Sequence, residues 1–188
     1  MAKPRSEEKR SAILAAATRV FATQGLGAPT AAIAQAAGVS NGSLFTYFET
    51  KTELFNQLYL ELKAEQGATA REALAGSADL REQARHVWGC WMAWATSYPE
   101  RRRTLAQLDV SDEITPESRA AGHAIMKDAG ELLHRMRADG PLRDVPLGFA
   151  IAIMSALSDT TADSMIREPD TAQEHCEVGF EALWRVLK

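Results

Sequence analysis

The sequence predicts an all-helical protein, with a small N-terminal helical domain followed by a larger helical bundle and about nine helices in total. Three observations support this fold class. Alanine is frequent, whereas the 188 residues include 12 glycines, 7 prolines and no run of β-branched residues, a composition that favours helix. Apolar residues recur at spacings of three and four. Breaks fall at glycine and proline, as at Gly140-Pro141 and Glu168-Pro169.

Three short N-terminal helices are expected at 6–24, 31–37 and 41–48. Ser6 can cap the first helix and Gly25 can end it, because a small polar residue suits a helix start and glycine suits the position after the last turn. Thr30 and Ser40 are the expected caps of the second and third helices. Gly38 lies between those two helices, where a tight corner needs the backbone freedom of glycine.

Longer helices are expected in the rest of the chain, at 51–75, 79–97, 100–110, 116–138, 147–167 and 171–187. Thr50 and Glu53 form a capping box that opens the first of these helices. Asp79 with Glu82 marks the start of the next helix, after a break at Gly76-Ser77.

Charge is distributed unevenly along the chain. The net charge of −4 argues against nonspecific binding to nucleic acid. Residues 1–51, however, carry six basic and three acidic side chains, against 15 basic and 22 acidic ones in the remainder. A basic head on an acidic body is typical of a protein whose one end meets phosphate.

Nothing in the sequence points to export or to a membrane. The N-terminus MAKPRSEEKR has no apolar core of a signal peptide. The longest apolar stretch, 148–157, is about half of the roughly 20 residues that a bilayer crossing needs. Cys90 and Cys176 fit no zinc or redox spacing, so reduced thiols are expected. We therefore expect a cytoplasmic, nucleoid-associated protein without a membrane partner.

The segment 30–54 carries the functional signal, because two short helices joined by a glycine-containing turn can place the second helix in a major groove about 12 Å wide. At 100° per residue, one arc of the second helix is expected to hold Asn41, Gly42, Phe45 and Thr46. Leu44 and Phe48 then point to the core. A helix that served only the core would not place Asn, Gly and Thr on one contiguous face.

This segment resembles the DNA-binding domain of the TetR (tetracycline-repressor-like) family of bacterial regulators. The matching positions are Thr30, Ile33-Ala34, Ala37-Gly38-Val39-Ser40, Gly42, Leu44-Phe45-Thr46-Tyr47-Phe48, Lys51 and Leu54. The match is ungapped and the resemblance covers about residues 6–60. The sequence departs from the family at Phe45, where the usual residue is Tyr. Phe45 lacks the hydroxyl that could reach a phosphate, but it could still contact a sugar or a thymine methyl group. The Ala28-Pro29 pair before Thr30 also replaces one of the usual paired threonines.

The resemblance implies a DNA-binding surface formed by Thr30, Ser40, Asn41, Gly42, Ser43, Phe45, Thr46, Tyr47 and Lys51. Thr30 and Ser40 would hold phosphates together with the backbone amides that they cap. Tyr47 and Lys51 would contact the DNA backbone, although Tyr47 also fits a core position. Base edges would be read by Asn41, which suits adenine, and by Ser43, Phe45 and Thr46.

The resemblance further implies a helix-turn-helix domain at 1–52 and a ligand-binding and dimerisation domain at 53–188, with helix 51–75 as connector. The residues expected at a two-fold dimer interface are Phe149, Ile153, Leu157, Phe180, Leu183, Trp184 and Leu187, which are more apolar than one-sided helices need. The alternative is that they form the core. A dimer would place two recognition helices about 34–36 Å apart on a palindromic operator.

A largely apolar small-molecule effector is a further expectation. Its expected pocket consists of Trp88, Trp91, Met92, His123, Met126, Met154 and Asp159, in which aromatic and methionine side chains supply apolar volume and His123 and Asp159 supply polar anchors. An aromatic row at helical spacing also fits an ordinary core.

The sequence therefore predicts a dimeric repressor that an effector releases from DNA. A regulator that is independent of ligand, one controlled by oxidation of Cys90 and Cys176, and an activator are alternatives. A helical-bundle enzyme is the least favoured reading, because no nucleophile elbow, phosphate loop or paired carboxylates in an apolar setting occur. No cofactor and no metal are expected, since His86 and Cys90 have no third ligand.

Overall fold

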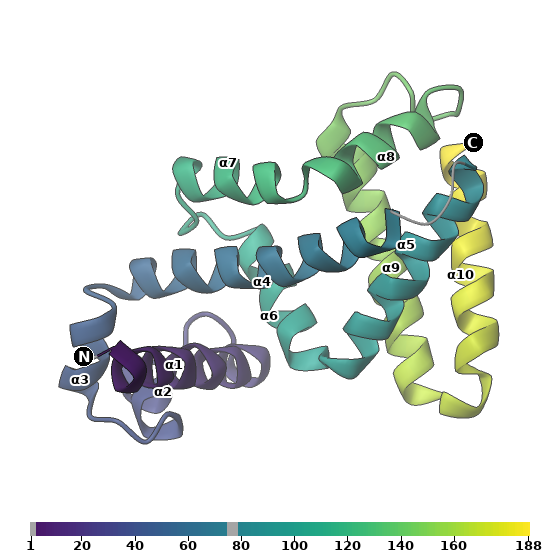
Figure 1. Cartoon of the computed structure of the whole chain (residues 1–188). Helices are drawn as coiled ribbons and strands as arrows, with labels where there is room; N and C mark the ends of the chain where they lie inside the picture. Colours follow the sequence, from purple (N-terminus) through teal and green to yellow (C-terminus); the bar gives the residue numbers. More distant parts are fainter. Residues whose placement is uncertain (1–2, 75–78) are drawn as a thin grey trace. The chain divides into compact units, whose positions relative to one another are not determined.

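The structure is a computed structural model that describes residues 3–74 and 79–188. The described part is helical throughout (Figure 1), with the elements α1 (Lys3–Gln24), α2 (Thr30–Ala36), α3 (Asn41–Tyr47), α4 (Lys51–Leu74), α5 (Leu80–Ser97), α6 (Pro99–Asp109), α7 (Pro116–Ile125), α8 (Lys127–Arg137), α9 (Leu147–Arg167), the 3-10 turn η1 (Pro169–Thr171) and α10 (Ala172–Leu187). The predicted all-helical class is confirmed. None of these helices is both long and apolar enough for a membrane span.

Most predicted helix boundaries agree with the structure to within one or two residues. Two predictions were wrong. The first helix already begins at Lys3, so Ser6 lies inside it and caps nothing. The single helix expected at 116–138 is two helices, α7 and α8. The break expected at Gly76-Ser77 lies outside the described residues.

The break between α7 and α8 falls at Met126, whose φ of −90° and ψ of 10° are not helical. Tertiary packing accounts for it. A Cβ on Gly67 of α4 would lie 2.8 Å from Ile125 Cγ2 and 2.9 Å from the Ile125 carbonyl oxygen, so the last residue of α7 packs on bare backbone. Because no glycine or proline marks this site, the local sequence does not reveal the break.

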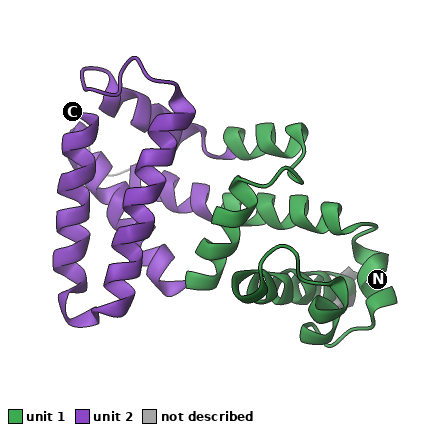
Figure 2. Cartoon of the chain, turned by 180° about the vertical axis from the view of Figure 1, so that it is seen from behind, with its two compact units in different colours: residues 1–64, 99–124 green, residues 65–98, 125–188 purple. Residues whose placement is uncertain are grey.

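The chain forms two compact units (Figure 2), one of residues 1–64 and 99–124 and the other of residues 65–98 and 125–188. The first unit thus joins the N-terminal helices to α6 and most of α7. Its core consists of side chains that are almost completely buried, among them Ile13, Leu14, Phe21, Ile33, Leu44, Phe48, Leu54, Leu58 and Leu108.

Helix α6 is fixed to α1 by hydrogen bonds as well as by apolar packing. The buried Thr104 hydroxyl donates to the Thr18 carbonyl oxygen at 2.9 Å, and the Gln107 amide donates to the Phe21 carbonyl oxygen at 3.1 Å. These bonds add directional constraints to apolar packing, which by itself has none. The N-terminal helices and α6 therefore belong to one packed body.

The second unit is built on the hairpin of α9 and α10, against which α5 packs. The close approach of these helices depends on Gly179, because a Cβ there would meet Thr161 and would lie 2.9 Å from the Trp88 ring. The Trp88 indole N–H donates to the Cys176 carbonyl oxygen at 2.9 Å. Glu181 of α10 also pairs with two arginines of α5, with Arg81 at 2.6 Å and with Arg85 at 2.8 Å.

Candidate nucleic-acid interface

Helices α2 and α3 meet at a tight corner at Gly38, whose φ of +68° is a conformation that side chains disfavour. The amide of Val39 donates to the Ala34 carbonyl oxygen at 3.0 Å, and the amide of Gly38 donates to that of Gln35 at 3.1 Å. These bonds satisfy carbonyls at the end of α2 and fix the direction in which α3 leaves the corner. The sequence prediction for Gly38 is confirmed.

The caps of the two helices differ from each other. The Ser40 hydroxyl accepts the Ser43 amide at 3.1 Å, so Ser40 caps α3 as predicted. Thr30 does not cap α2 and that prediction was wrong. The N-cap position is occupied by Pro29, no side chain caps this helix, and Thr30 is its first residue. The Thr30 hydroxyl is therefore not used by the helix start.

Helix α3 has one buried face and one exposed face, and the predicted division between them is confirmed. Leu44 is fully buried and the following Phe48 is 1% exposed. The exposed face consists of Asn41, Gly42, Phe45 and Thr46.

The packing of the chain does not require a glycine at position 42. Apart from adjacent residues and the backbone of its own helix, a Cβ on Gly42 would have no heavy atom within 4 Å, and the φ of Gly42 is not positive. Asn41 makes no side-chain hydrogen bond to any other residue that the structure describes. Thr46 donates its hydroxyl proton to the Gly42 carbonyl oxygen at 3.2 Å, which leaves its oxygen lone pairs available as acceptors. The face is thus exposed, partly polar and almost unused within the chain.

The remaining predicted contact residues border this face. Ser43 and Tyr47 are half-buried on α3. Lys51, the first residue of α4, is also half-buried, and its ammonium lies 5.4 Å from the centroid of the Phe55 ring. This cation–π contact holds the Lys51 charge beside the end of α3.

The predicted pair of Thr50 and Glu53 caps the N-terminus of α4. The Glu53 amide donates to the Thr50 hydroxyl at 3.0 Å, while the Glu53 carboxylate accepts the Glu49 amide at 2.7 Å. The carboxylate thus reaches one residue further back than in a regular capping box. It orders the connection that runs from α3 into α4.

Two further residues that support this surface had not been predicted. Arg10 of α1 donates to the Gln57 amide oxygen at 3.0 Å, and its guanidinium carbon lies 5.8 Å from the centroid of the Phe48 ring. Arg10 therefore connects α1 with α4 and with the end of α3. Arg19 reaches the Ala36 carbonyl oxygen at 3.5 Å, near the end of α2. No short motif distinguishes either arginine from an ordinary surface cation.

Asn56 of α4 also supports this surface, and it is only 8% exposed. Its amide nitrogen donates to the Thr52 carbonyl oxygen at 2.7 Å and to that of Glu113 at 2.9 Å, and its amide oxygen accepts the Thr115 amide at 2.9 Å. The Thr52 hydroxyl also donates to the Glu113 carboxylate at 2.6 Å. This network fastens the loop between α6 and α7 to the first turns of α4.

The segment that contains this corner is similar to known proteins. Residues 13–58 match the family of bacterial regulatory proteins described as the tetR family. This N-terminal segment is therefore similar to the DNA-binding segment of TetR-family regulators. A TetR-family transcription regulator from Marinobacter aquaeolei VT8 matches with 24% identity and a TM-score of 0.84, over 97% of each chain.

Two other solved structures extend the comparison beyond this segment. A TetR-family protein from Shewanella sp. PV-4 matches with 27% identity and a TM-score of 0.79, over 94% of this chain and 96% of that one. The regulator LfrR from Mycobacterium smegmatis, solved in complex with proflavine, has 21% identity and a TM-score of 0.66, over 94% of this chain and 95% of that one. The TetR fold therefore extends over nearly the whole chain, beyond the matched N-terminal segment.

The residues expected to form an effector pocket differ in their burial. Trp88 is 5% exposed and Met92 is 1% exposed, and the bond from Trp88 to Cys176 together with the approach of Gly179 makes Trp88 a packed core residue. Trp91 is half-buried and stacks on Trp94 with ring centroids 4.9 Å apart.

The remaining polar and methionine members of that expected pocket are half-buried or exposed. Met126, Met154 and Asp159 are half-buried. His123 is exposed on α7 and belongs to the first compact unit, whereas the other members belong to the second.

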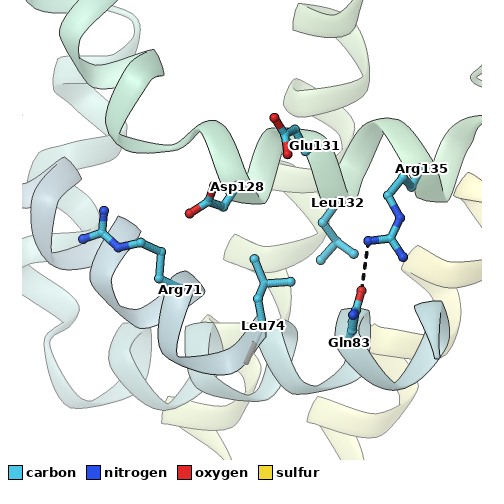
Figure 3. Close-up of a pocket in the computed structure, with 7 residues that line it drawn as sticks. All are labelled: Arg71, Leu74, Gln83, Asp128, Glu131, Leu132 and Arg135. Atoms are coloured by element: carbon cyan, nitrogen blue, oxygen red, sulfur yellow. Dashed lines mark hydrogen bonds between the residues drawn. The ribbon is translucent and has the colours of Figure 1, made fainter. Parts of the chain in front are cut away.

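A pocket of about 300 Å³ lies elsewhere in the second unit (Figure 3). It is lined by Arg71 and Leu74 of α4, Gln83 of α5, and Asp128, Glu131, Leu132 and Arg135 of α8. Arg135 donates to the Gln83 amide oxygen at 3.1 Å across it. Its lining contains charges of both signs, which differs from the apolar lining that the sequence had suggested.

The residues expected at a dimer interface divide into two groups. Phe180, Leu183 and Leu187 are between 0% and 4% exposed, so within one chain they belong to the core. Phe149 is 56% exposed, and Ile153, Leu157 and Trp184 are half-buried. Further exposed apolar side chains on α9 and α10 are Leu147, Ile151, Ile166 and Val178.

The two cysteines are half-buried and unpaired. Burial raises the pKa of the Cys90 thiol, and the nearby Glu72 carboxylate raises it further. Burial also raises the pKa of the Cys176 thiol. Both thiols are therefore held in the protonated, less reactive form at neutral pH. Among the described residues, no three His, Cys, Asp or Glu side chains form a group that could hold a metal.

Proposed function

We propose that this chain is a transcriptional repressor that binds a palindromic operator as a homodimer. The single observation that carries the proposal is the exposed face of α3, where Asn41, Gly42, Phe45 and Thr46 are presented by a helix that is anchored on its other side by Leu44 and Phe48. A face that the fold itself does not use fits a role outside the chain. The family match at 13–58 supports DNA as the partner.

Roles for the individual residues follow from their chemistry. Asn41 offers the amide donor and acceptor that pair with adenine, and Ser43 and Thr46 offer hydroxyl oxygens for base edges. Gly42 allows the backbone of α3 to approach the base pairs closely. Phe45 offers an apolar contact.

Phosphate contacts surround this reading surface. Thr30 is the first residue of α2, and Ser40 directly precedes α3. Neither residue donates its hydroxyl proton to a helix cap. Tyr47 adds a phenolic hydroxyl and Lys51 a positive charge. Backbone contacts of this type fix the register of the protein on DNA but carry no sequence information.

Dimerisation through α9 and α10 is supported by their exposed apolar side chains. Phe149 at 56% exposed and Val178 at 62% exposed are large apolar groups that a monomer would leave in water. Pairing of two such hairpins about a two-fold axis makes a four-helix interface. The two recognition helices would then enter successive major grooves about 34–36 Å apart.

Release by a small, largely apolar effector completes the proposed mechanism, with residues 53–188 as the effector-binding and dimerisation domain. Such an effector must bind the DNA-free conformer more tightly, and about 1–3 kcal/mol of coupling is typical. The proflavine complex of LfrR supports a flat organic ligand as the class to test. Half-buried Trp91, Met126 and Met154 remain the candidate contacts in this chain.

Other modes of control have less support. The raised pKa values of Cys90 and Cys176 disfavour thiolates, so control by oxidation is the weaker alternative. Activation in place of repression depends on where the operator lies relative to a promoter. The match of residues 13–58 to a family of regulatory proteins disfavours a helical-bundle enzyme, and the sequence contains no motif that supports catalysis.

The decisive experiment selects bound duplexes from a random DNA pool and then measures their affinity for variants. We expect a palindrome as the selected sequence. Asn41→Ala should relax the preference at specific positions, with a loss of about 5- to 150-fold for the preferred base. Lys51→Ala should weaken all duplexes alike and reduce the salt slope by about 1.

The control is Lys127→Ala, which removes an exposed lysine of α8 that pairs with Glu131 at 3.6 Å. It should leave both affinity and salt slope unchanged. A protein that shows no preference among duplexes at modest ionic strength would contradict the proposal. A selected site without two-fold symmetry, or sedimentation as a monomer, would contradict the dimer.

A further inference from the structure

We infer that Phe45 reads the C5-methyl group of a thymine in each half of the operator. The inference rests on the proposed function, because it assumes that the exposed face of α3 enters a major groove. Phe45 is 39% exposed, whereas the apolar residues before and after it on the helix, Leu44 and Phe48, are buried. Within the described residues, no aromatic partner stacks on the Phe45 ring.

The chemistry of this ring limits what it can contact. Phenylalanine carries no donor or acceptor, so it cannot hydrogen-bond to phosphate or to the polar edge of a base. In the major groove, base pairs present nitrogen and oxygen donors and acceptors, and the C5-methyl group of thymine is the apolar group that protrudes among them. A phenyl ring that enters the groove therefore gains most beside this methyl group, where both apolar surfaces leave water together.

The neighbours of Phe45 on the helix leave its ring accessible. A helical side chain covers the turn on the N-terminal side of its own Cα, which for Phe45 is the turn that contains Asn41 and Gly42. Gly42 has no side chain, and the space beside it is open. The result is an apolar spot next to a free amide. Adjacent contacts to a thymine methyl by Phe45 and to an adenine by Asn41 then select A·T pairs at this position.

The test replaces the thymines of the selected operator with deoxyuridine, one pair of symmetry-related positions at a time. This exchange removes only the methyl group. Burial of one methyl is worth a factor of about four in affinity. We therefore expect one symmetric pair of replacements to weaken wild-type binding by about 10- to 20-fold, a factor of about four from each half-site. Phe45→Ala should bind the thymine and uracil duplexes equally well.

Two further variants sharpen the result. Phe45→Tyr keeps the ring and should keep the discrimination between thymine and uracil. Val110→Ala removes an 83% exposed apolar side chain in the turn after α6, and this variant should discriminate as the wild type does. Wild-type binding that is insensitive to every uracil replacement overturns the inference, as does a sensitive position that stays sensitive in Phe45→Ala. These results leave the proposed function standing if the duplexes are still selected, whereas loss of all sequence preference would refute the proposed function itself.

Discussion

Replacing Gly42 by alanine separates what the fold needs from what DNA binding needs. In a helix, glycine is about 0.8–1.0 kcal/mol less favourable than alanine. Because a Cβ on Gly42 would contact no other side chain, nothing in the structure opposes this gain. We expect Gly42→Ala to raise the free energy of unfolding by about 0.5–1 kcal/mol, or the Tm by about 1–4 °C for a chain of this size.

The same methyl group should weaken binding to DNA. It would stand on the exposed face of α3, where the proposed approach to base edges leaves no room for it. Overpacking a close contact costs about 1–3 kcal/mol, which corresponds to a loss of affinity of at least about fivefold. The expected variant is thus more stable than the wild type and a poorer DNA binder.

Urea unfolding followed by circular dichroism and a fluorescence anisotropy titration with the selected operator measure the two effects. The control is Gly130→Ala in α8, where a Cβ would also have no neighbour within 4 Å. It should be stabilised similarly and should bind DNA as the wild type does. Unchanged affinity in Gly42→Ala would refute the close approach at this residue, and a loss of stability would refute the structural reasoning.

Three further predictions concern stability, assembly and thiol chemistry. Asn56→Ala removes three hydrogen bonds and leaves the Glu113 carbonyl and the Thr115 amide without their partner, so it should lower the free energy of unfolding by about 2–4 kcal/mol in urea denaturation; a cost below about 0.5 kcal/mol would mean that water replaces the amide. Phe149→Glu places a charge among the exposed apolar residues of α9 and should give monomers in sedimentation velocity, while an intact dimer would locate the interface elsewhere. Because burial raises the pKa of the Cys90 and Cys176 thiols, both should react with iodoacetamide at pH 7 more slowly in the folded protein than in urea, and equal rates would contradict their protection.

Local sequence patterns were sufficient for the elements that present the recognition surface. The corner at Gly38, the Ser40 cap and the division of α3 into Leu44 and Asn41 sides depend on residues within one or two turns of each other. Such short-range chemistry is visible in the sequence. Thr30 was mistaken for a cap because its residue type is right, whereas Pro29 occupies the cap position.

Contacts between distant residues explain what the sequence did not reveal. Asn56 looks like a polar interruption of an apolar stripe, since its partners Glu113 and Thr115 lie 57 and 59 residues away. Apolar periodicity predicts that a side chain is buried, but it does not predict whether the same chain or a partner chain buries it. For this reason the core residue Phe180 and the exposed Phe149 were placed together in one interface.

The hydrogen bonds from α6 to α1 bear on how regulators of this kind can be recombined. Thr104 and Gln107 bond to carbonyls that lie on the far side of the chain's proposed domain boundary at residue 52. A chimera that grafts residues 1–52 onto a foreign body would pair α1 with an α6 that never evolved beside it. A graft that also exchanges residues 99–124 keeps the native contacts between α1 and α6. Residues 1–52 and 99–124 are therefore expected to covary among homologues.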